Sequence, residues 1–209
     1  MSTEVTEAVA AEPPLPTAKG ARHRGAYLEM LVSSLIGLIA ALVLSVEAIQ
    51  LAADPNAIFS CDINEKISCA KVALTWQANL LGFPNAFLGL IAEPVVITVA
   101  VAGLGGVRFP RWFMNLAMAV YFIGLVFAYW LFYEAYFVIG ALCPWCLLVT
   151  VTTTTVFASL LRVTLADNTF RFPEGLHARV QSWLRIGVDV WITILLIAVL
   201  AAMVIFRYI

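Results

Sequence analysis

Residues 27–52 read YLEMLVSSLIGLIAALVLSVEAIQLA, an apolar stretch long enough to cross a lipid bilayer as a helix. A membrane-spanning helix needs about 20 mostly apolar residues, because each residue adds only ~1.5 Å along the helix axis. Similar stretches follow at residues 85–102, 111–133, 140–161 and 188–205. The first of these four contains Glu93, and an ionisable residue in a span usually faces the bundle interior. Five transmembrane helices are therefore predicted, which makes the chain an all-α integral membrane protein.

The composition of the whole chain agrees with this fold class. Hydrophobic residues make up 63% of the 209 residues and charged residues 12%. A soluble domain carries about 45–50% apolar and about 25% charged residues. The chain therefore has too little polar surface to cover itself in water, and membrane lipid must cover the rest. Its net charge of −1 provides no basic field for nucleic acid, so nucleic-acid binding is not expected.

The first 25 residues differ from everything that follows. They begin with acidic residues and prolines and end in a basic cluster, formed by Lys19, Arg22, His23 and Arg24. Such a composition is typical of a disordered tail that ends beside the membrane. A secretory signal peptide would instead begin with positive charge. We therefore predict a disordered cytoplasmic tail at residues 1–25 and one transmembrane domain at residues 26–209.

The positively charged residues indicate which side of the membrane each connection faces. Cytoplasmic connections carry an excess of Lys and Arg. If five helices alternate in direction, nine of the twelve Lys and Arg residues fall on the side of the N-terminus, and only Lys66, Lys71 and Arg207 fall opposite. This predicts a multi-pass protein of the plasma (inner) membrane with a cytoplasmic N-terminus and an outer C-terminus. The assignment requires that residues 85–102 form a membrane helix.

This topology places all four cysteines on the outer, non-cytoplasmic side. Cys61 and Cys69 lie in the connection at residues 53–84, and Cys143 and Cys146 begin the fourth helix as a C-x-x-C pair. At a helix start the first thiol of such a pair lies near unpaired N–H groups and the positive end of the dipole, which stabilise its thiolate. A disulfide that closes so small a loop adds little stability. The C-x-x-C pair is therefore predicted to react.

The pair formed by Cys61 and Cys69 is expected to be exposed to the oxidising compartment, where disulfides persist. Two structural disulfides, cysteines buried as small apolar groups, or a zinc site are the alternatives. Zinc is disfavoured because the gap between Cys61 and Cys69 is wider than zinc sites usually show. In addition, His23 and His177 are both predicted to be cytoplasmic. No metal is expected.

Together these features resemble the bacterial homologues of vitamin K epoxide reductase. The features are the C-x7-C pair, Thr75 six residues later, GFPN at residues 82–85 and IGALCPWC at residues 139–146. The resemblance covers roughly residues 27–161. It implies a four-helix bundle around a quinone, either menaquinone or ubiquinone, with the fifth helix alongside. Many bacterial members carry a thioredoxin-like domain after that helix, and because this sequence stops at Ile209, a separate partner is expected.

The resemblance also implies an electron relay through the cysteines. Cys61 would form a mixed disulfide with a reduced thioredoxin-fold (DsbA-like) partner outside the membrane. Cys69 would then exchange with Cys143, and Cys146 would face the quinone and reduce it. A protein partner needs an accessible sulfur, whereas a lipid-soluble quinone is reached from within the bundle. The order of the two pairs is therefore chemically reasonable, with the loop pair wet and mobile.

Four residues before the second helix are candidates for the quinone site. Thr75 matches a family position with Ser or Thr near the quinone, although a helix-surface hydroxyl is an alternative. Asn85 could hydrogen-bond a quinone oxygen or cap the second helix, and capping is slightly favoured. Phe83 and Trp76 could line the quinone pocket or anchor the interface. A short interfacial helix is predicted at residues 68–76.

The resulting hypothesis is a membrane thiol–disulfide oxidoreductase that supports disulfide bond formation. It would reoxidise the secreted partner and transfer the electrons through two cysteine pairs to the quinone. The same residues would also serve a quinone or quinone-epoxide reductase whose main product is the reduced quinone. A membrane scaffold with structural disulfides and a redox sensor are alternatives from other classes.

Overall fold

The structure, a computed structural model, describes residues 23–208, so residues 1–22 of the predicted disordered tail lie outside the described residues. Five helices in the described part are long and apolar enough to cross a membrane, which confirms the predicted fold class. The long helices are α1 (Arg24–Ala53), α3 (Ala86–Leu104), α4 (Arg111–Tyr133), α5 (Pro144–Ala166) and α7 (Val188–Tyr208). The stretch with Glu93 and Pro94 forms α3 without a break, and the Glu93 side chain is buried in the bundle as expected.

Short elements lie in the connections. The connection after α1 contains α2 (Cys69–Ala73) and the 3-10 turn η2 (Trp76–Asn79), and the π-helical segment η3 (Glu134–Ile139) continues α4. The amphipathic α6 (Glu174–Ile186) joins α5 to α7. The single helix predicted over residues 68–76 is therefore too long. It is divided because Thr75 is extended and its hydroxyl donates to the Val72 carbonyl at 2.7 Å.

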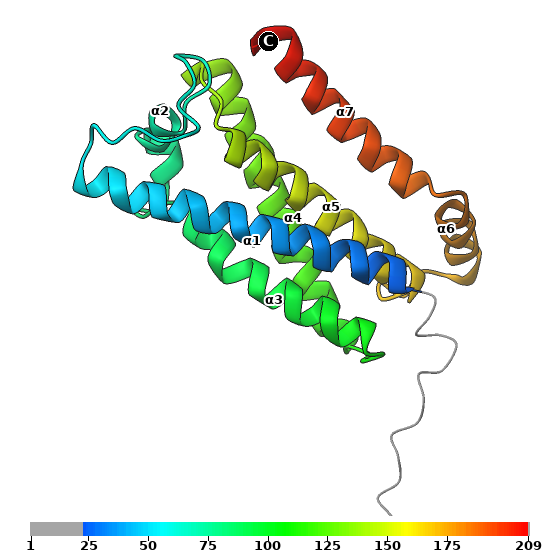
Figure 1. Cartoon of the computed structure of the whole chain (residues 1–209). Helices are drawn as coiled ribbons and strands as arrows, with labels where there is room; N and C mark the ends of the chain where they lie inside the picture. Colours follow the sequence, from blue (N-terminus) through cyan, green and yellow to red (C-terminus); the bar gives the residue numbers. More distant parts are fainter. Residues whose placement is uncertain (1–22, 209) are drawn as a thin grey trace, which may run out of the picture.

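Four of the long helices form the bundle and the fifth stands at its side (Figure 1). α1 packs against both α3 and α5, and α4 packs against α5. α7 contacts α5 and α6, and it runs apart from α1 and α3 in Figure 1. The main apolar core joins α1, α3, α4 and α5 near the start of α1, around Met30, Ala100, Met118 and Val156.

α1 and α3 approach one another closely because small residues lie at their contact. A Cβ atom added at Gly89 would come within 2.7 Å of the Ala41 Cβ atom. One added at Gly103 would overlap the Tyr27 ring. In lipid, where the hydrophobic effect does not bring helices together, such small residues allow the close van der Waals packing that does. The α1–α3 contact therefore depends on these glycines.

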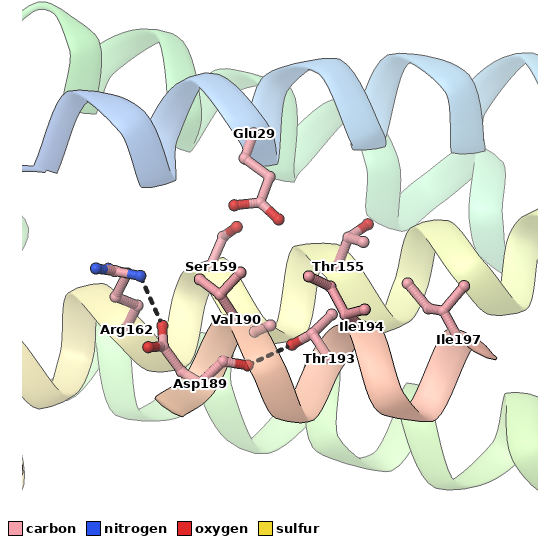
Figure 2. A pocket seen from close by; sticks show the side chains of 10 residues that line it. Glu29, Thr155, Ser159, Arg162, Asp189, Val190, Thr193, Ile194 and Ile197 are labelled. Carbon is pink, nitrogen blue, oxygen red and sulfur yellow. Dashed lines mark hydrogen bonds and ion pairs between the residues drawn. The ribbon is translucent and has the colours of Figure 1, made fainter. Parts of the chain in front are cut away.

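α7 is attached to the bundle by a polar contact at its start. The Arg162 guanidinium of α5 pairs with the Asp189 carboxylate at 2.9 Å and donates to the Leu184 carbonyl at 3.1 Å. Beside this pair lies a cavity of about 120 Å³, into which Glu29 points from α1 and Ser159 from α5 (Figure 2). This cavity is far from any cysteine along its helices, so it belongs to the attachment of the fifth helix.

The connectivity gives the bundle two different ends. The end of α1, the start of α3 and the start of α5 meet at one end, together with α2 and η2, and we call this the cysteine end. The start of α1 and the end of α5 meet at the opposite end, where the His23 ring contacts the Asp167 carboxylate at 3.1 Å. All four cysteines therefore lie at one end of the molecule.

Candidate functional site

The four cysteines form one cluster at the cysteine end. Cys61 and Cys69 are joined by a disulfide, whereas Cys143 and Cys146 are free thiols. The Cys143 Sγ atom lies 3.2 Å from the Cys69 Sγ atom, so the two pairs are in direct contact. Apolar side chains pack around the sulfurs, namely Leu44, Phe59, Val72 and Trp145. The sequence predicted that the two pairs come together, and the structure brings them together.

The loop pair is more enclosed than the sequence suggested. Cys61 is 6% exposed and Cys69 is 2% exposed, so the expectation of an exposed loop pair is wrong. The segment that carries them is held against the start of α5 by backbone hydrogen bonds. The Ser68 N–H donates to the Leu142 carbonyl at 3.0 Å, and the Leu142 N–H donates to the Lys66 carbonyl at 2.9 Å. The polar segment that carries Cys61 and Cys69 therefore covers their sulfurs. The backbone hydrogen bonds that hold it there cannot be recognised from its composition.

Asp62 organises the segment between the two loop cysteines. Its carboxylate accepts hydrogen bonds from the Ser68 hydroxyl at 2.7 Å, the Phe59 N–H at 2.8 Å and the Ala70 N–H at 3.0 Å. Burial raises the pKa of Asp62, but these hydrogen bonds outweigh it and hold the pKa below its ordinary value. The carboxylate thus fixes the residues on both sides of the Cys61–Cys69 bridge. Sequence reasoning did not single out Asp62.

Cys143 occupies the N-cap position of α5 and Pro144 the first helical position, where its missing N–H costs nothing, so the C-x-x-C pair stands at the helix start as predicted. The Cys146 N–H donates to the Cys143 Sγ atom at 3.4 Å. A hydrogen bond from the Cys146 thiol, together with the Cys146 and Trp145 N–H groups, lowers the pKa of Cys143, although burial and the Glu47 carboxylate oppose this shift. A thiol of lowered pKa gives the thiolate, which is the nucleophile in disulfide exchange.

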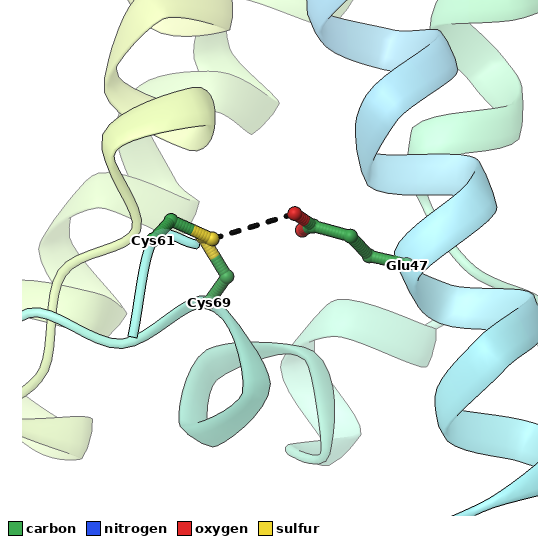
Figure 3. A group of neighbouring side chains, drawn as sticks. All are labelled: Glu47, Cys61 and Cys69. Atoms are coloured by element: carbon green, nitrogen blue, oxygen red, sulfur yellow. Dashed lines mark hydrogen bonds between the residues drawn. A yellow bond between two sulfur atoms is a disulfide. The ribbon is translucent and has the colours of Figure 1, made fainter. Parts of the chain in front are cut away.

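Glu47 reaches the loop disulfide from the end of α1. Figure 3 shows its carboxyl group pointing at the bridge, with the Oε1 atom 3.4 Å from the Cys61 Sγ atom. Glu47, Cys61 and Cys69 lie close enough to act as metal ligands. Metal binding would require thiolates, and in this state the two sulfurs are bonded to one another. Sequence reasoning missed Glu47 because it falls inside a predicted membrane span.

The four residues predicted for the quinone site fall within residues 75–85, before and at the start of α3. The Asn85 Nδ2 atom donates to the Gln77 carbonyl at 2.6 Å, which joins η2 to α3. Thr75 bonds its own turn. Trp76, 64% exposed, contacts Trp130 of α4 with ring centroids 6.1 Å apart, and Phe83 stacks on Phe87. Their contact with a quinone stays a prediction.

The slightly favoured interpretation of Asn85, as a residue whose side chain caps the second helix, is wrong. Asn85 stands at the N-cap position of α3, but its side chain makes no capping hydrogen bond. Its amide nitrogen bonds η2 instead, and its buried Oδ1 atom has no hydrogen-bond partner among residues 23–208. Gln77, which sequence reasoning did not single out, donates to the Glu134 carboxylate at 3.1 Å and ties η2 to the end of α4. Asn85 Oδ1 is therefore a buried acceptor within the predicted site.

Comparison with known proteins gives one finding. The family model described as the vitamin K epoxide reductase family matches residues 28–161, which is more than half of the chain. The match includes all four cysteines and the helices α3 and α4, whereas α7 lies beyond it. No curated protein matches the chain. The matched range agrees closely with the range over which the sequence resembled that family.

Proposed function

The chain belongs to the vitamin K epoxide reductase family, and on this premise we propose that it reoxidises a secreted thioredoxin-fold (DsbA-like) protein and transfers the electrons to a membrane quinone. Family membership and the five apolar helices make the chain a multi-pass membrane oxidoreductase of disulfide and quinone chemistry. The proposal adds three points to this statement. They are the thioredoxin-fold partner, the route of the electrons, and menaquinone or ubiquinone as the electron acceptor.

The contact between Cys143 and Cys69 is the observation that carries the proposal. Exchange of a disulfide requires a thiolate in line with one sulfur of the bridge. Cys143 has a lowered pKa, and its Sγ atom is 3.2 Å from Cys69 in the Cys61–Cys69 bridge. The scaffold alternative would pair the cysteines as two structural disulfides. Here Cys143 and Cys146 are free thiols instead.

The proposed relay takes the cysteines in turn. A thiolate of the partner attacks Cys61, the Cys61–Cys69 bond breaks, and Cys69 leaves as a thiolate. Cys69 then attacks Cys143 of an oxidised C-x-x-C pair, which releases Cys146. Because Cys61 is buried, the partner must displace the segment that Asp62 organises before it reaches the sulfur. A second thiolate of the partner then attacks the partner's own sulfur in the mixed disulfide, which forms the partner's disulfide and releases Cys61 as a thiolate. Cys61 attacks Cys69 in the Cys69–Cys143 bridge and releases Cys143, so the chain reaches the state described above, with the loop oxidised and the C-x-x-C pair reduced.

The residues near η2 and α3 fit a quinone. A quinone supplies an acceptor for two electrons and two protons, and its reduced form carries hydroxyl groups. The buried Asn85 Oδ1 atom without a partner can accept a hydrogen bond from such a hydroxyl. Trp76 and Phe83 provide aromatic surface within the same stretch of sequence before Asn85. Thr75, whose hydroxyl already donates to Val72, can offer only its acceptor capacity.

The experiment that tests this function follows quinone absorbance. Purified protein is incubated with a short-chain menaquinone or ubiquinone analogue and a reduced thioredoxin-fold protein of the DsbA type. Quinone reduction is expected with the wild-type chain and should be lost in Cys143→Ala and in Cys146→Ala. Glu29→Gln, at the opposite end of α1, is the control and should keep the wild-type rate. Full activity in either cysteine variant would contradict the relay.

A further inference from the structure

Glu47 is a buried carboxyl group that contacts a reacting sulfur and has no other assigned part. It is 7% exposed. Among residues 23–208 its one hydrogen-bond partner is Cys61, and no ion pair joins it to a Lys, Arg or His side chain. A carboxylate buried without a cation is costly. Glu47 is therefore expected to serve the chemistry of Cys61 rather than the stability of α1.

The oxidation state of Cys61 decides where the proton in this contact lies. A disulfide sulfur carries no hydrogen, so Cys61 in the bridge can only accept. The 3.4 Å contact is then a hydrogen bond when Glu47 is protonated and its O–H donates to the Cys61 Sγ atom. When the bridge is reduced, Cys61 is a thiol and can donate the same proton back. The pair Glu47–Cys61 can thus hold one proton in both oxidation states.

We propose that Glu47 is a catalytic residue, the general base and acid that holds the proton of Cys61 during exchange between the two cysteine pairs. This inference rests on the proposed function. In the linking step the Cys61 thiol gives its proton to the Glu47 carboxylate, and the Cys61 sulfur attacks Cys69 in a Cys69–Cys143 disulfide. The Cys61–Cys69 bond forms and the Cys69–Cys143 bond breaks. The electron pair leaves on Cys143 as a thiolate, so no outside oxidant or reductant is needed.

The charges around the site favour this movement of the proton. The titratable groups that face Glu47 are Cys61 and Asp62 of the loop and Cys143 and Cys146 at the start of α5. A Glu47 carboxylate opposes formation of the Cys143 thiolate. In the linking step Glu47 becomes neutral at the moment when Cys143 becomes negative. The number of negative charges in the cluster therefore stays the same throughout the step.

The inference is tested without a partner and without a quinone. In a Cys146→Ser background, Cys143 can attack Cys69 and release Cys61, which is the linking step in reverse. The protein is prepared with the Cys61–Cys69 bridge, and the approach to equilibrium with the Cys69–Cys143 bridge is followed by quenching, alkylation and peptide mass spectrometry. Glu47→Gln should slow this exchange about 100-fold at pH 7, because general acid–base groups contribute roughly that much. Glu29→Gln, a matched carboxyl change on the same helix, should leave it unchanged.

The pH profile separates proton transfer from a structural role. Without the carboxyl group, exchange must pass through a free Cys61 thiolate, which becomes common only near the ordinary cysteine pKa of about 8.5. The deficit of Glu47→Gln should therefore shrink as the pH rises from 7 to 9. Glu47→Asp, which keeps a carboxyl group one methylene further away, should be impaired less than Glu47→Gln at pH 7, and its smaller deficit should also shrink as the pH rises.

An unchanged rate in Glu47→Gln, or a loss that is equal at every pH, would overturn the inference. If Glu47→Gln does not fold, as judged by its thermal unfolding, the decision passes to Glu47→Asp, in which a deficit that shrinks as the pH rises supports the inference and an unchanged rate or a pH-independent loss overturns it. The two proposals fail separately. Exchange that depends on Glu47 in a protein that reduces no quinone would contradict only the proposed function, and normal quinone reduction with no effect of Glu47 would contradict only this inference.

Discussion

Cys143 shows how one residue type in one position produces the reactive centre. As the N-cap of α5 its Sγ atom accepts the Cys146 N–H, one of the donors that a helix start leaves unpaired. The same position presents the sulfur to Cys69, because Leu142, one residue earlier, is hydrogen-bonded to the loop that carries it. The helix start thus lowers the pKa of the Cys143 thiol and also holds its sulfur beside Cys69.

The hydrogen bond from the Cys146 thiol is the largest contribution to the lowered pKa of Cys143. Replacing Cys146 by Ala removes this donor and leaves only the backbone N–H groups. We therefore expect Cys146→Ala to raise the pKa of Cys143. The measurement is the ultraviolet absorbance of the thiolate as a function of pH, with a Cys143→Ser, Cys146→Ala double variant subtracted as the background. A pKa that stays where it is in the wild-type chain would show that the helix N–H groups suffice.

Asp62 gives the loop a dependence on pH whose sign follows from its hydrogen bonds. The pKa of Asp62 is lower in the folded chain than its ordinary value of 3.8. A group of this kind stabilises the folded loop above its unfolded pKa, and that stabilisation is lost as the pH falls through the folded pKa. Protection of the Ala70 amide against hydrogen exchange should therefore be constant from neutral pH down to about 4 and should fall below it.

Substitution of Asp62 tests the same contacts at neutral pH. Asp62→Asn should reduce the protection of the Ala70 amide about 30-fold, which corresponds to about 2 kcal/mol for hydrogen bonds to a charged acceptor. Asp54→Asn is the matched control in the same connection, because the Asp54 carboxylate accepts one hydrogen bond, from the exposed Asn56 N–H at 3.0 Å. Equal effects of the two substitutions would show that the Asp62 contacts do not hold the loop.

Among the individual site residues, the sequence predicted those that can be recognised from their spacing to residues nearby in the chain. Cys143 and Cys146 are recognisable because a C-x-x-C pair directly before an apolar helix is visible in the sequence itself. Glu47 and Asp62 are not, because what matters about them is a neighbour brought by folding. Glu47 is 14 residues from Cys61, and nothing in an apolar span indicates that its carboxyl group meets a sulfur. Burial of the loop cysteines was equally hidden, since backbone pairing with Leu142 produces it.

Among the elements, α1 and α3 form the contact that is most sensitive to side-chain size. Gly89→Ala adds a Cβ atom 2.7 Å from the Ala41 Cβ atom, which has no rotatable bond with which to move away. We expect Gly89→Ala to lower the free energy of unfolding in detergent by about 1–3 kcal/mol, as overpacked sites do. Thermal or denaturant unfolding of the purified protein provides the measurement.

Gly124 in α4 is the matched control for that substitution. A Cβ atom added there meets nothing within 4 Å. Gly124→Ala should therefore be neutral or stabilise the protein by up to about 1 kcal/mol, because alanine is the better helix former. If Gly89→Ala were as well tolerated as Gly124→Ala, the close approach of α1 and α3 would not limit the stability of the bundle.

The elements themselves were largely predictable, and their ends were less so. Length and apolarity specify a membrane helix, because backbone groups in lipid must be paired within the segment. Even the span with Glu93 and Pro94 was found, and the Tyr121 hydroxyl donates to the Glu93 carboxyl group at 3.2 Å. The fourth helix was predicted to begin at residue 140, but Gly140 is left-handed, with φ of 69°, and α5 begins at Pro144. Turn geometry rather than hydrophobicity set that boundary.

For the whole molecule, the family match and the helix packing both separate the four-helix bundle from α7. Residues 28–161 contain α3, α4 and most of α1 and α5, the helices that surround the main core. α7 lies beyond that range and is attached through Arg162 and Asp189 and through Leu200, which packs with Phe132. The redox cluster draws its residues from α1, the loop and α5. Within the part of α7 that the structure describes, no residue belongs to the sulfur cluster.

The sidedness of the bundle is the property on which the proposed partner depends, and exposed positions at its two ends can test it. In a chain whose four cysteines are replaced by Ala, Asn56→Cys marks the cysteine end and Val107→Cys marks the opposite end, and both parent residues are exposed. Nine Lys and Arg residues against three predict that the opposite end is cytoplasmic. A membrane-impermeant maleimide should therefore label Asn56→Cys in intact cells and Val107→Cys only after permeabilisation. The reverse pattern would place the sulfurs in the cytoplasm, where thiols are kept reduced, and a secreted partner could not reach them.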